Sequence, residues 1–168
     1  MKKIILIICL LLGVNLSADL VQDAVKENGK GNYEKANELF NKACNTGNMK
    51  GCWALGLMYY TSGKPEDKIK TKALYEKACD GGYMEGCSFL GDMYNIIDSG
   101  IAPDRTKARE LYKKACDGGN ANACFSIASM YYYGDSVKQD KVKAKALYKK
   151  ACDGGATMNA CALYKRLK

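Results

Sequence analysis

Four segments of the chain place apolar and small residues at spacings of three and four positions, which is the periodicity of an amphipathic helix. In the first segment these residues are Ala36, Leu39, Phe40, Ala43 and Cys44. The matching sets are Thr71, Leu74, Tyr75, Ala78 and Cys79; Ala108, Leu111, Tyr112, Ala115 and Cys116; and Ala144, Leu147, Tyr148, Ala151 and Cys152. Lysine and glutamate fill most remaining positions, so each segment is expected to bury one face.

A second helix is expected after each of the first three segments. It carries small residues, cysteine, an aliphatic residue, methionine and tyrosine in a fixed order, over residues 51–59, 86–94 and 123–131. Glycine inside a helix costs about 1 kcal/mol relative to alanine, so Gly56 and Gly91 indicate close packing against a neighbour. The fourth copy ends early, over residues 164–168. We expect either a shortened second helix or a final helix face solvated by its lysine and arginine residues.

The four copies recur with a nearly constant period. Their first cysteines are 35, 37 and 36 residues apart, which is typical of a stacked repeat array. We therefore predict an all-α fold, an α/α solenoid of four helical hairpins. The repeats are placed at about 33–67, 68–103, 104–139 and 140–168. A capping helix at about 19–31 is expected to cover the open end.

The hairpins are expected to be joined by polar loops at residues 61–68, 98–105 and 134–141. Asp67, Asp104 and Asp140 stand at the ends of these loops, where a carboxylate accepts hydrogen bonds from the free N–H groups of a helix start. Within each hairpin, an acidic or amide residue followed by glycine predicts the turn between the two helices.

The first 18 residues predict a secretory signal peptide, with Lys2 and Lys3 before an apolar run at residues 4–12. This run is shorter than the roughly 20 residues that span a membrane, although an uncleaved anchor is the alternative. Ile8 precedes Cys9 where a lipoprotein would carry a small residue, so no lipid anchor is expected. The predicted product is a repeat domain at residues 19–168, secreted or periplasmic and without a stable membrane anchor.

The repeat domain holds eight cysteines, which predict a disulfide framework in an exported protein. Eight cysteines allow 105 connectivities. A hairpin whose turn separates two cysteines by eight or nine positions brings them close enough to bond. The favoured pairs are Cys44/Cys52, Cys79/Cys87, Cys116/Cys124 and Cys152/Cys161. Zinc is the alternative, but it prefers cysteines two to four apart, often with histidine. The chain has no histidine, so neither metal nor cofactor is expected.

The formal net charge of the chain is +8, and its lysines are spread through every repeat. Solvated helix faces explain this distribution, and a partner with an acidic surface is the alternative. No nucleic-acid motif is present, so a nucleic-acid partner is not expected. The domain is expected to be a monomer.

The pattern Ala-x-x-Leu-Tyr-x-Lys-Ala-Cys-Asp-x-Gly, followed by Gly-Cys-x-x-Leu-Gly-x-Met-Tyr, resembles the Sel1-like repeat, a relative of the tetratricopeptide repeat. Two cysteines per copy and the predicted signal peptide make the chain similar to the secreted Helicobacter cysteine-rich protein family. This resemblance implies an α/α solenoid with one disulfide per hairpin. It also implies penicillin binding with weak β-lactamase activity.

The sequence lacks the motifs of known β-lactamases. None of the seven serines is followed by lysine at the third position, and Lys-Thr-Gly and Ser-Asp-Asn are absent. Metallo-β-lactamases need histidine ligands, and there are none. Thr61 stands three residues before Lys64, but it lies in a predicted loop. No catalytic residue is identified, and any hydrolysis would need an unorthodox site.

The leading hypothesis is a binding module whose solenoid surface holds a protein, a peptide, or a peptidoglycan or penicillin-like ligand. A weak β-lactamase is the alternative, and a passive structural antigen is the third possibility. Tyr60, Tyr132 and Tyr133 are the candidate ligand-binding residues, because they follow the periodic tyrosines near the ends of second helices. The periodic residues Tyr59, Tyr94 and Tyr131 are expected to belong to the core between repeats.

Overall fold

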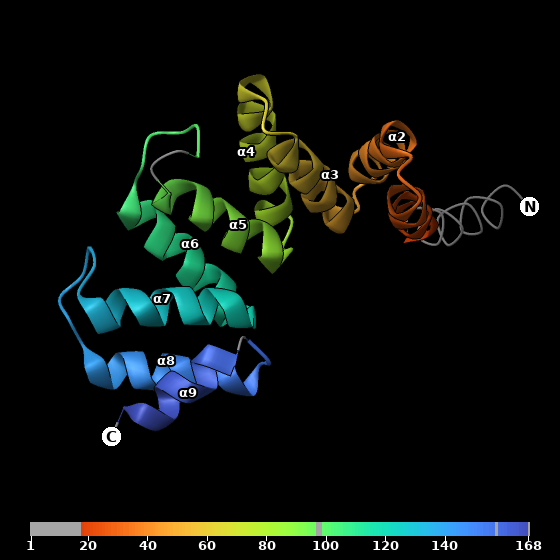
Figure 1. The fold of residues 1–168 in the computed structure, drawn as a ribbon. Coiled ribbons are helices and arrows are strands. Elements are labelled where there is room, and N and C mark those ends of the chain that lie inside the picture. Colours follow the sequence, from red (N-terminus) through yellow and green to blue (C-terminus); the bar gives the residue numbers. More distant parts are fainter. Residues whose placement is uncertain (1–17, 97–98, 157, 168) are drawn as a thin grey trace, which may run out of the picture. The chain divides into compact units, whose positions relative to one another are not determined.

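The structure is a computed structural model that describes residues 18–96, 99–156 and 158–167. Within these ranges every regular element is a helix (Figure 1), so the all-α prediction is confirmed. The predicted signal peptide at residues 1–18 lies outside the described residues except for Ala18. The chain divides into two compact units, with the boundary between Gly81 and Gly82.

The first unit contains a helix at residues 18–29, followed by α2 (Tyr33–Asn45), α3 (Met49–Ser62) and α4 (Pro65–Asp80). In its core, the N-terminal helix contributes Leu20, Val21 and Ala24. Their partners on α2 and α3 are Ala36, Phe40, Ala43, Ala54 and Leu55. The short apolar stripe of the N-terminal helix therefore covers a face of the first hairpin that would otherwise meet solvent.

The second unit contains α5 (Met84–Asn95), α6 (Arg105–Asp117), α7 (Ala121–Tyr133), α8 (Lys141–Asp153) and α9 (Met158–Arg166). Each of these helices packs against the next one along the chain. Figure 1 shows α7 and α8 lying side by side, and their shared core contains Ala128, Ala144 and Tyr148. The fourth repeat has a shortened second helix, one of the two expectations from the sequence, because α9 has nine residues.

Disulfides join the two helices of a hairpin at the turn. Bridges link Cys44 to Cys52, Cys116 to Cys124 and Cys152 to Cys161, with Cα–Cα distances of 4.4, 4.6 and 4.8 Å. Cys79 and Cys87 are disulfide-bonded as well. A bridge that closes such a short loop stabilises the folded chain by about 2–3 kcal/mol in the chain-entropy estimate.

The paired glycines of the hairpin turns have two different roles, as α6 and α7 show. Gly119 has a φ of +94°, a left-handed conformation that side chains with a Cβ rarely adopt. Gly118 has an ordinary φ of −78°, but a Cβ placed there would lie 2.4 Å from Sδ of Met84. The first glycine of the pair therefore leaves room for a methionine of the preceding repeat, and the second allows the chain to reverse.

Buried tyrosine rings lie against the small residues of the preceding second helix. Tyr75, Tyr112 and Tyr148 are the largest fully buried side chains in the described part of the chain. A Cβ on Gly56 would lie 2.7 Å from the Tyr75 ring, and one on Gly91 would lie 2.8 Å from the Tyr112 ring. The prediction that Gly56 and Gly91 allow close packing against a neighbouring helix is confirmed.

The hydroxyl of Tyr112 is also fixed, by a hydrogen bond. It donates a hydrogen bond of 2.6 Å to Oδ1 of Asp92, one residue beyond Gly91 on α5. Burial raises the pKa of Asp92 above its ordinary value, and the hydrogen bond from Tyr112 opposes that change. In the next copy, the hydroxyls of Tyr148 and Ser129 are 3.0 Å apart. Polar partners at this position hold the ring in one orientation.

The first connection between repeats is shorter than the sequence predicted. Helix α3 continues to Ser62 and α4 begins at Pro65, so the predicted loop at residues 61–68 is wrong. Gly63 ends α3 with a φ of 69°, and proline fits the first position of a helix because it lacks an N–H there. Asp67 therefore lies inside the first turn of α4 and is not its N-cap, which is Lys64.

The two later connections end as predicted, with an aspartate cap. Oδ1 of Asp140 accepts a hydrogen bond of 2.8 Å from the Lys143 backbone, and its own N–H donates to the Tyr131 carbonyl. The Lys143 ammonium lies 4.1 Å from the centre of the Tyr131 ring. The same arrangement is formed at the start of α6 by Asp104, Lys107 and Tyr94. Cap and cation–π contact together attach each first helix to the second helix before it.

A buried carboxylate connects the N-terminal helix to the start of α2. Glu27 is 8% exposed and accepts hydrogen bonds of 2.8 Å from Nζ of Lys30 and Nδ2 of Asn32. These hydrogen bonds, with the charges of Lys30 and Lys35, lower the pKa of Glu27 to about 2. Because the folded pKa is lowered, the stabilisation by Glu27 is present above its ordinary pKa and disappears as the pH falls toward 2.

We predict that Gly91→Ala destabilises the protein by about 1–2 kcal/mol, because the cost of overpacking exceeds the gain in helix propensity. The added methyl group would collide with the Tyr112 ring, whose hydroxyl is bound to Asp92. Urea unfolding followed by circular dichroism measures the change. Gly29→Ala is the control, since a Cβ there meets nothing within 4 Å. A Gly91→Ala protein as stable as the parent would show that the contact is not limiting.

We also predict that Glu27→Gln lowers the thermal midpoint at pH 7 and has little effect at pH 2.5. The glutamine cannot form the charged contacts with Lys30 and Lys35, and at low pH the parent is losing those contacts as well. Thermal unfolding from pH 2 to pH 7 compares the two proteins, and their curves should converge as the pH falls. A constant difference at every pH would exclude ionisation as the cause.

Candidate functional site

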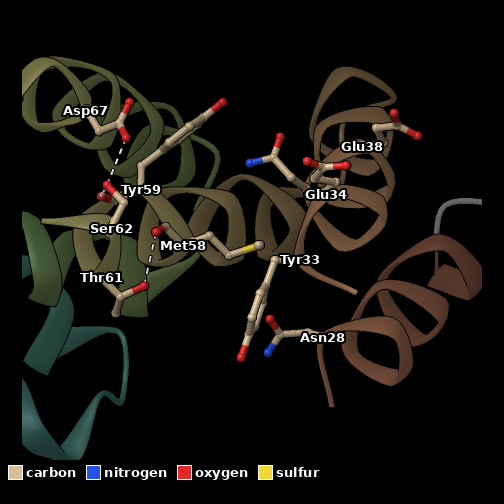
Figure 2. A pocket seen from close by; sticks show the side chains of 10 residues that line it. Asn28, Tyr33, Glu34, Glu38, Met58, Tyr59, Thr61, Ser62 and Asp67 are labelled. Carbon is tan, nitrogen blue, oxygen red and sulfur yellow. Dashed lines mark hydrogen bonds between the residues drawn. The ribbon is translucent and has the colours of Figure 1, made fainter. Parts of the chain in front are cut away.

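The candidate site is an open groove of about 860 Å³ on the first unit (Figure 2). Its volume lies within the range of roughly 300–1,000 Å³ that small ligands and short peptide segments occupy in proteins. Three helices and the first turn of a fourth line it. The lining residues are Asn28, Tyr33, Glu34, Asn37, Glu38, Met58, Tyr59, Thr61, Ser62 and Asp67.

The α2 wall of the groove is acidic and rich in amides. Glu34, Asn37 and Glu38 are spaced by three and four residues, so they share one face of α2. Glu34 and Glu38 are exposed, and Asn37 is half-buried. No lysine or arginine is among the residues that line the groove. The wall therefore presents negative charge and amide hydrogen-bonding groups in a protein whose net charge is positive.

The opposite wall is apolar and is supplied by α3. Figure 2 shows the Met58 side chain extending from α3 toward the α2 side of the groove. The half-buried Tyr59 of α3 adds aromatic surface to this wall, and Tyr33, the first residue of α2, is 64% exposed and adds a second ring from the α2 side. Methionine is flexible and polarisable, so it adapts to ligands of different shape. The groove thus combines an apolar contact surface with a rim of carboxylates and amides.

Asp67 closes the groove at the junction of α3 and α4. Its carboxylate accepts hydrogen bonds of 2.8 Å from Oγ of Ser62 and 3.0 Å from Nζ of Lys70. The hydrogen bond from Ser62 and the contact with Lys70 lower the pKa of Asp67 below its ordinary value. Asp67 is 6% exposed, so this charge is fixed in position and supports the end of the groove.

The arrangement is suited to binding rather than to nucleophilic chemistry. The hydroxyls of Thr61 and Ser62 donate to backbone carbonyls and to Asp67, and neither has a lysine positioned to accept its proton. Among the described residues, no group of three or more acidic, histidine or cysteine side chains is placed to hold a metal ion. The same part of the chain contains no helix long and apolar enough to cross a membrane.

The tyrosines singled out from the sequence lie outside this groove and differ in exposure. Tyr60 is 42% exposed at the end of α3, and Tyr133 is 72% exposed at the end of α7. Tyr132 is half-buried, because its ring turns toward α8 and lies 6.4 Å from that of Tyr148. The expected exposure of Tyr132 is therefore only partial.

The periodic tyrosines are also less uniform than expected. Tyr94 is buried at 7% exposure, as predicted for a core residue. Tyr59 and Tyr131 are half-buried, each with a lysine ammonium over its ring, Lys70 at 5.1 Å and Lys143 at 4.1 Å. These two rings form part of the surface as well as of the packing between helices.

Sequence reasoning did not identify the groove residues on α2. Glu34, Asn37 and Glu38 occupy the polar face of an amphipathic helix, where any soluble protein carries such residues. Their proximity to Met58 and Asn28 arises only when three helices pack together. The one available signal was Asn37, an amide at a register where the later repeats carry a cation. Those cations are Lys72, Arg109 and Lys145.

Comparison with protein families matches the Sel1 repeat to residues 24–48, 50–83, 85–120 and 121–155. These matches cover most of the chain and continue through both units. A comparison with curated proteins gives no match.

Several solved structures are similar to the chain. Cysteine rich protein B of Helicobacter pylori is 31% identical, with a TM-score of 0.62, over 77% of this chain and 92% of that protein. A Sel1 repeat protein from Oxalobacter formigenes is 22% identical, with a TM-score of 0.79, over 88% of this chain. A protective antigen of uropathogenic Escherichia coli with an SLR fold is 23% identical, with a TM-score of 0.52, over 80% of this chain.

The chain spans 61% of the Oxalobacter protein and 38% of the Escherichia coli antigen, so these two structures establish the fold alone. The four repeat matches and the disulfide-bonded hairpins agree with the α/α solenoid class predicted from the sequence. By its repeats and by its likeness to the Helicobacter protein, the chain belongs to the Sel1 repeat family.

Proposed function

We propose that the protein is an exported binding module that holds an extended peptide segment of a partner protein in the groove of the first unit. Sel1 repeat proteins generally mediate protein–protein interactions. The observation that carries the proposal is the pairing of an acidic, amide-rich wall on α2 with the apolar side chains of Met58 and Tyr33. This combination suits a peptide, which carries both polar and apolar groups, better than it suits a purely apolar ligand.

The chemistry of the groove favours a peptide that carries a basic side chain. Glu34 and Glu38 supply two exposed carboxylates without a lining cation to neutralise them. The Asn37 amide offers both a donor and an acceptor, as the backbone of an extended peptide requires. Met58 and Tyr33 would contact an apolar side chain of the same peptide. A lysine or arginine beside an apolar residue is thus the expected recognition motif.

The disulfides support a site of action outside the cytoplasm. Disulfides persist in oxidising compartments and are rare in the reducing cytosol, and all eight cysteines of the repeats are bonded. The finer proposal is that the protein is secreted or periplasmic. A peptidoglycan fragment is the alternative ligand of the groove outside the cytoplasm.

The β-lactamase alternative has no support from the comparisons or from the site. Thr61 donates to backbone carbonyls, and Ser62 donates to Asp67. The contacts with Ser62 and Lys70 lower the pKa of Asp67, which makes this carboxylate a weak base for activating the serine. Incidental turnover of a bound amide would need a catalytic group that the lining residues do not supply. The binding measurement below distinguishes a binding module from a passive structural antigen.

We predict that the double variant Glu34→Gln and Glu38→Gln weakens binding of a basic peptide about fivefold, because each exposed ion pair contributes about 0.5 kcal/mol. Twelve-residue peptides are first selected by phage display against the mature chain with its disulfides intact. Fluorescence anisotropy then gives the dissociation constants at low and high salt. The effect of the substitutions should shrink at high salt.

The matched control is Glu110→Gln, an exposed glutamate at the same register on α6, which should leave the affinity unchanged. Equal weakening by the control would contradict the groove assignment. Selected peptides without basic residues would contradict the recognition motif. If no peptide is enriched while a purified peptidoglycan stem binds, the ligand is a cell-wall fragment, and if neither binds, the passive role is correct.

A further inference from the structure

A second pocket, of about 430 Å³, lies within the second unit beside the connection from α7 to α8. We call it the α6–α8 pocket, and its lining residues are Arg109, Tyr131, Val137, Lys138, Gln139 and Asp140. Two of these side chains are cationic, one is a phenol, one is an amide, one is a carboxylate and one is apolar. None of them lines the groove of the first unit, so the pocket is a separate site.

The wall of this pocket is a loop held in place at both ends. At its start, the Asp135 N–H donates to the Met130 carbonyl at 2.9 Å, and the Asp135 carboxylate forms an ion pair with Arg105 of α6. At its end, Nε2 of Gln139 donates to the Tyr132 carbonyl at 2.8 Å, and Asp140 caps α8. A ligand would therefore meet a preformed surface and would not have to order a loose segment.

Arg109 is the distinctive residue of the pocket. It is half-buried on α6, and among the described residues it makes no ion pair or hydrogen bond. The neighbouring cations on the same helix do have partners, since Arg105 binds Asp135 and Lys113 binds Asp117. The carboxylate in the pocket, Asp140, caps α8 and forms no ion pair with Arg109 among the described residues. The Arg109 guanidinium therefore has donors free for a bound anion.

The Tyr131 hydroxyl adds an oriented donor. Nζ of Lys143 donates to Tyr131 Oη at 2.7 Å, so this oxygen acts as an acceptor and its own proton remains available. No acceptor for that proton is present among the described residues. Lys113 also lies near: its ion pair with Asp117 raises its pKa, and the proximity of Tyr131 adds to the increase. Cations of α6 and α8 thus surround one phenol.

None of the other three repeats has an arginine at this register, although the fourth carries Lys145 and Lys149 there. Arg109 and Lys113 occupy the register of Lys72 and Glu76 in the second copy, where the two side chains pair with each other at 3.2 Å. The same positions are asparagines in the first copy, Asn37 and Asn41. An unpaired arginine at this register is therefore a property of the third repeat, and the framework of the repeat does not require it.

We propose that the α6–α8 pocket binds a peptide carboxylate, with the Arg109 guanidinium as a two-pronged donor and Tyr131 and Lys138 as further donors. The planar fork of arginine matches the two oxygens of a carboxylate. Asp140 also lines the pocket, and its charge opposes a dianion such as phosphate more strongly than a monoanion. The proposal rests on the proposed peptide-binding function but concerns a different site.

The test uses the mature chain with its disulfides intact and the tripeptide acetyl-Ala-Ala-Ala with a free carboxylate. Two-dimensional NMR of isotope-labelled protein follows the backbone amides of residues 134–140 and the side-chain Nε of Arg109. The free acid should shift these signals, and the same peptide with a C-terminal amide should bind at least about tenfold more weakly. Arg109→Gln should weaken binding of the acid by about tenfold, the effect expected for a charge-assisted hydrogen bond.

The matched control is Arg166→Gln, which removes the same charge from an exposed position on α9. It should leave the shifts and the affinity unchanged, and the dispersed spectra of both variants verify that they fold. Equal binding of acid and amide, or equal loss in both variants, would overturn the proposal. Tighter binding of inorganic phosphate than of the acid would reassign the pocket to phosphate. If basic peptides still bind the groove, a negative result here removes the carboxylate site alone.

Discussion

The contact between a buried tyrosine ring and a small residue on the preceding helix is the constraint on which each unit depends. Gly56 and Gly91 let the rings of Tyr75 and Tyr112 approach within a distance that a Cβ would block. In the last copy Ala128 takes this position, and it shares a core with Tyr148. Because the interior is close-packed, the separation of the two helices follows from this contact. Caps and disulfides then hold the hairpin ends around it.

Once this spacing is set, the solvent-facing positions of the first helices are free to vary. The same register carries Asn37 and Glu38 in the first copy, and Arg109 and Glu110 in the third. One frame thereby presents an acidic, amide-rich surface in one unit and a cationic pocket in the other. In a repeat protein, such variation changes recognition without changing the core, since each repeat contacts only its neighbours.

The disulfides fix the turns of the hairpins. The bridges at Cys44, Cys116 and Cys152 each lie at a hairpin turn, where they join two short helices. Small units of this kind need such staples, because their cores are limited. The two candidate sites lie on solvent-facing positions, where exposed carboxylates, amides and cations are suited to recognition.

The sequence by itself determined the helical hairpins, their period and the cysteines placed at their turns, because periodicity, capping and turn chemistry are local properties. It failed at the first connection, where Pro65 begins a helix early and draws Asp67 into the first turn. Only the tertiary structure decided which polar residues form a site. Glu34 and Met58 line one groove from two different helices, and Arg109 and Tyr131 line the other pocket in the same way. No spacing along the chain encodes such neighbours, since helix packing sets them.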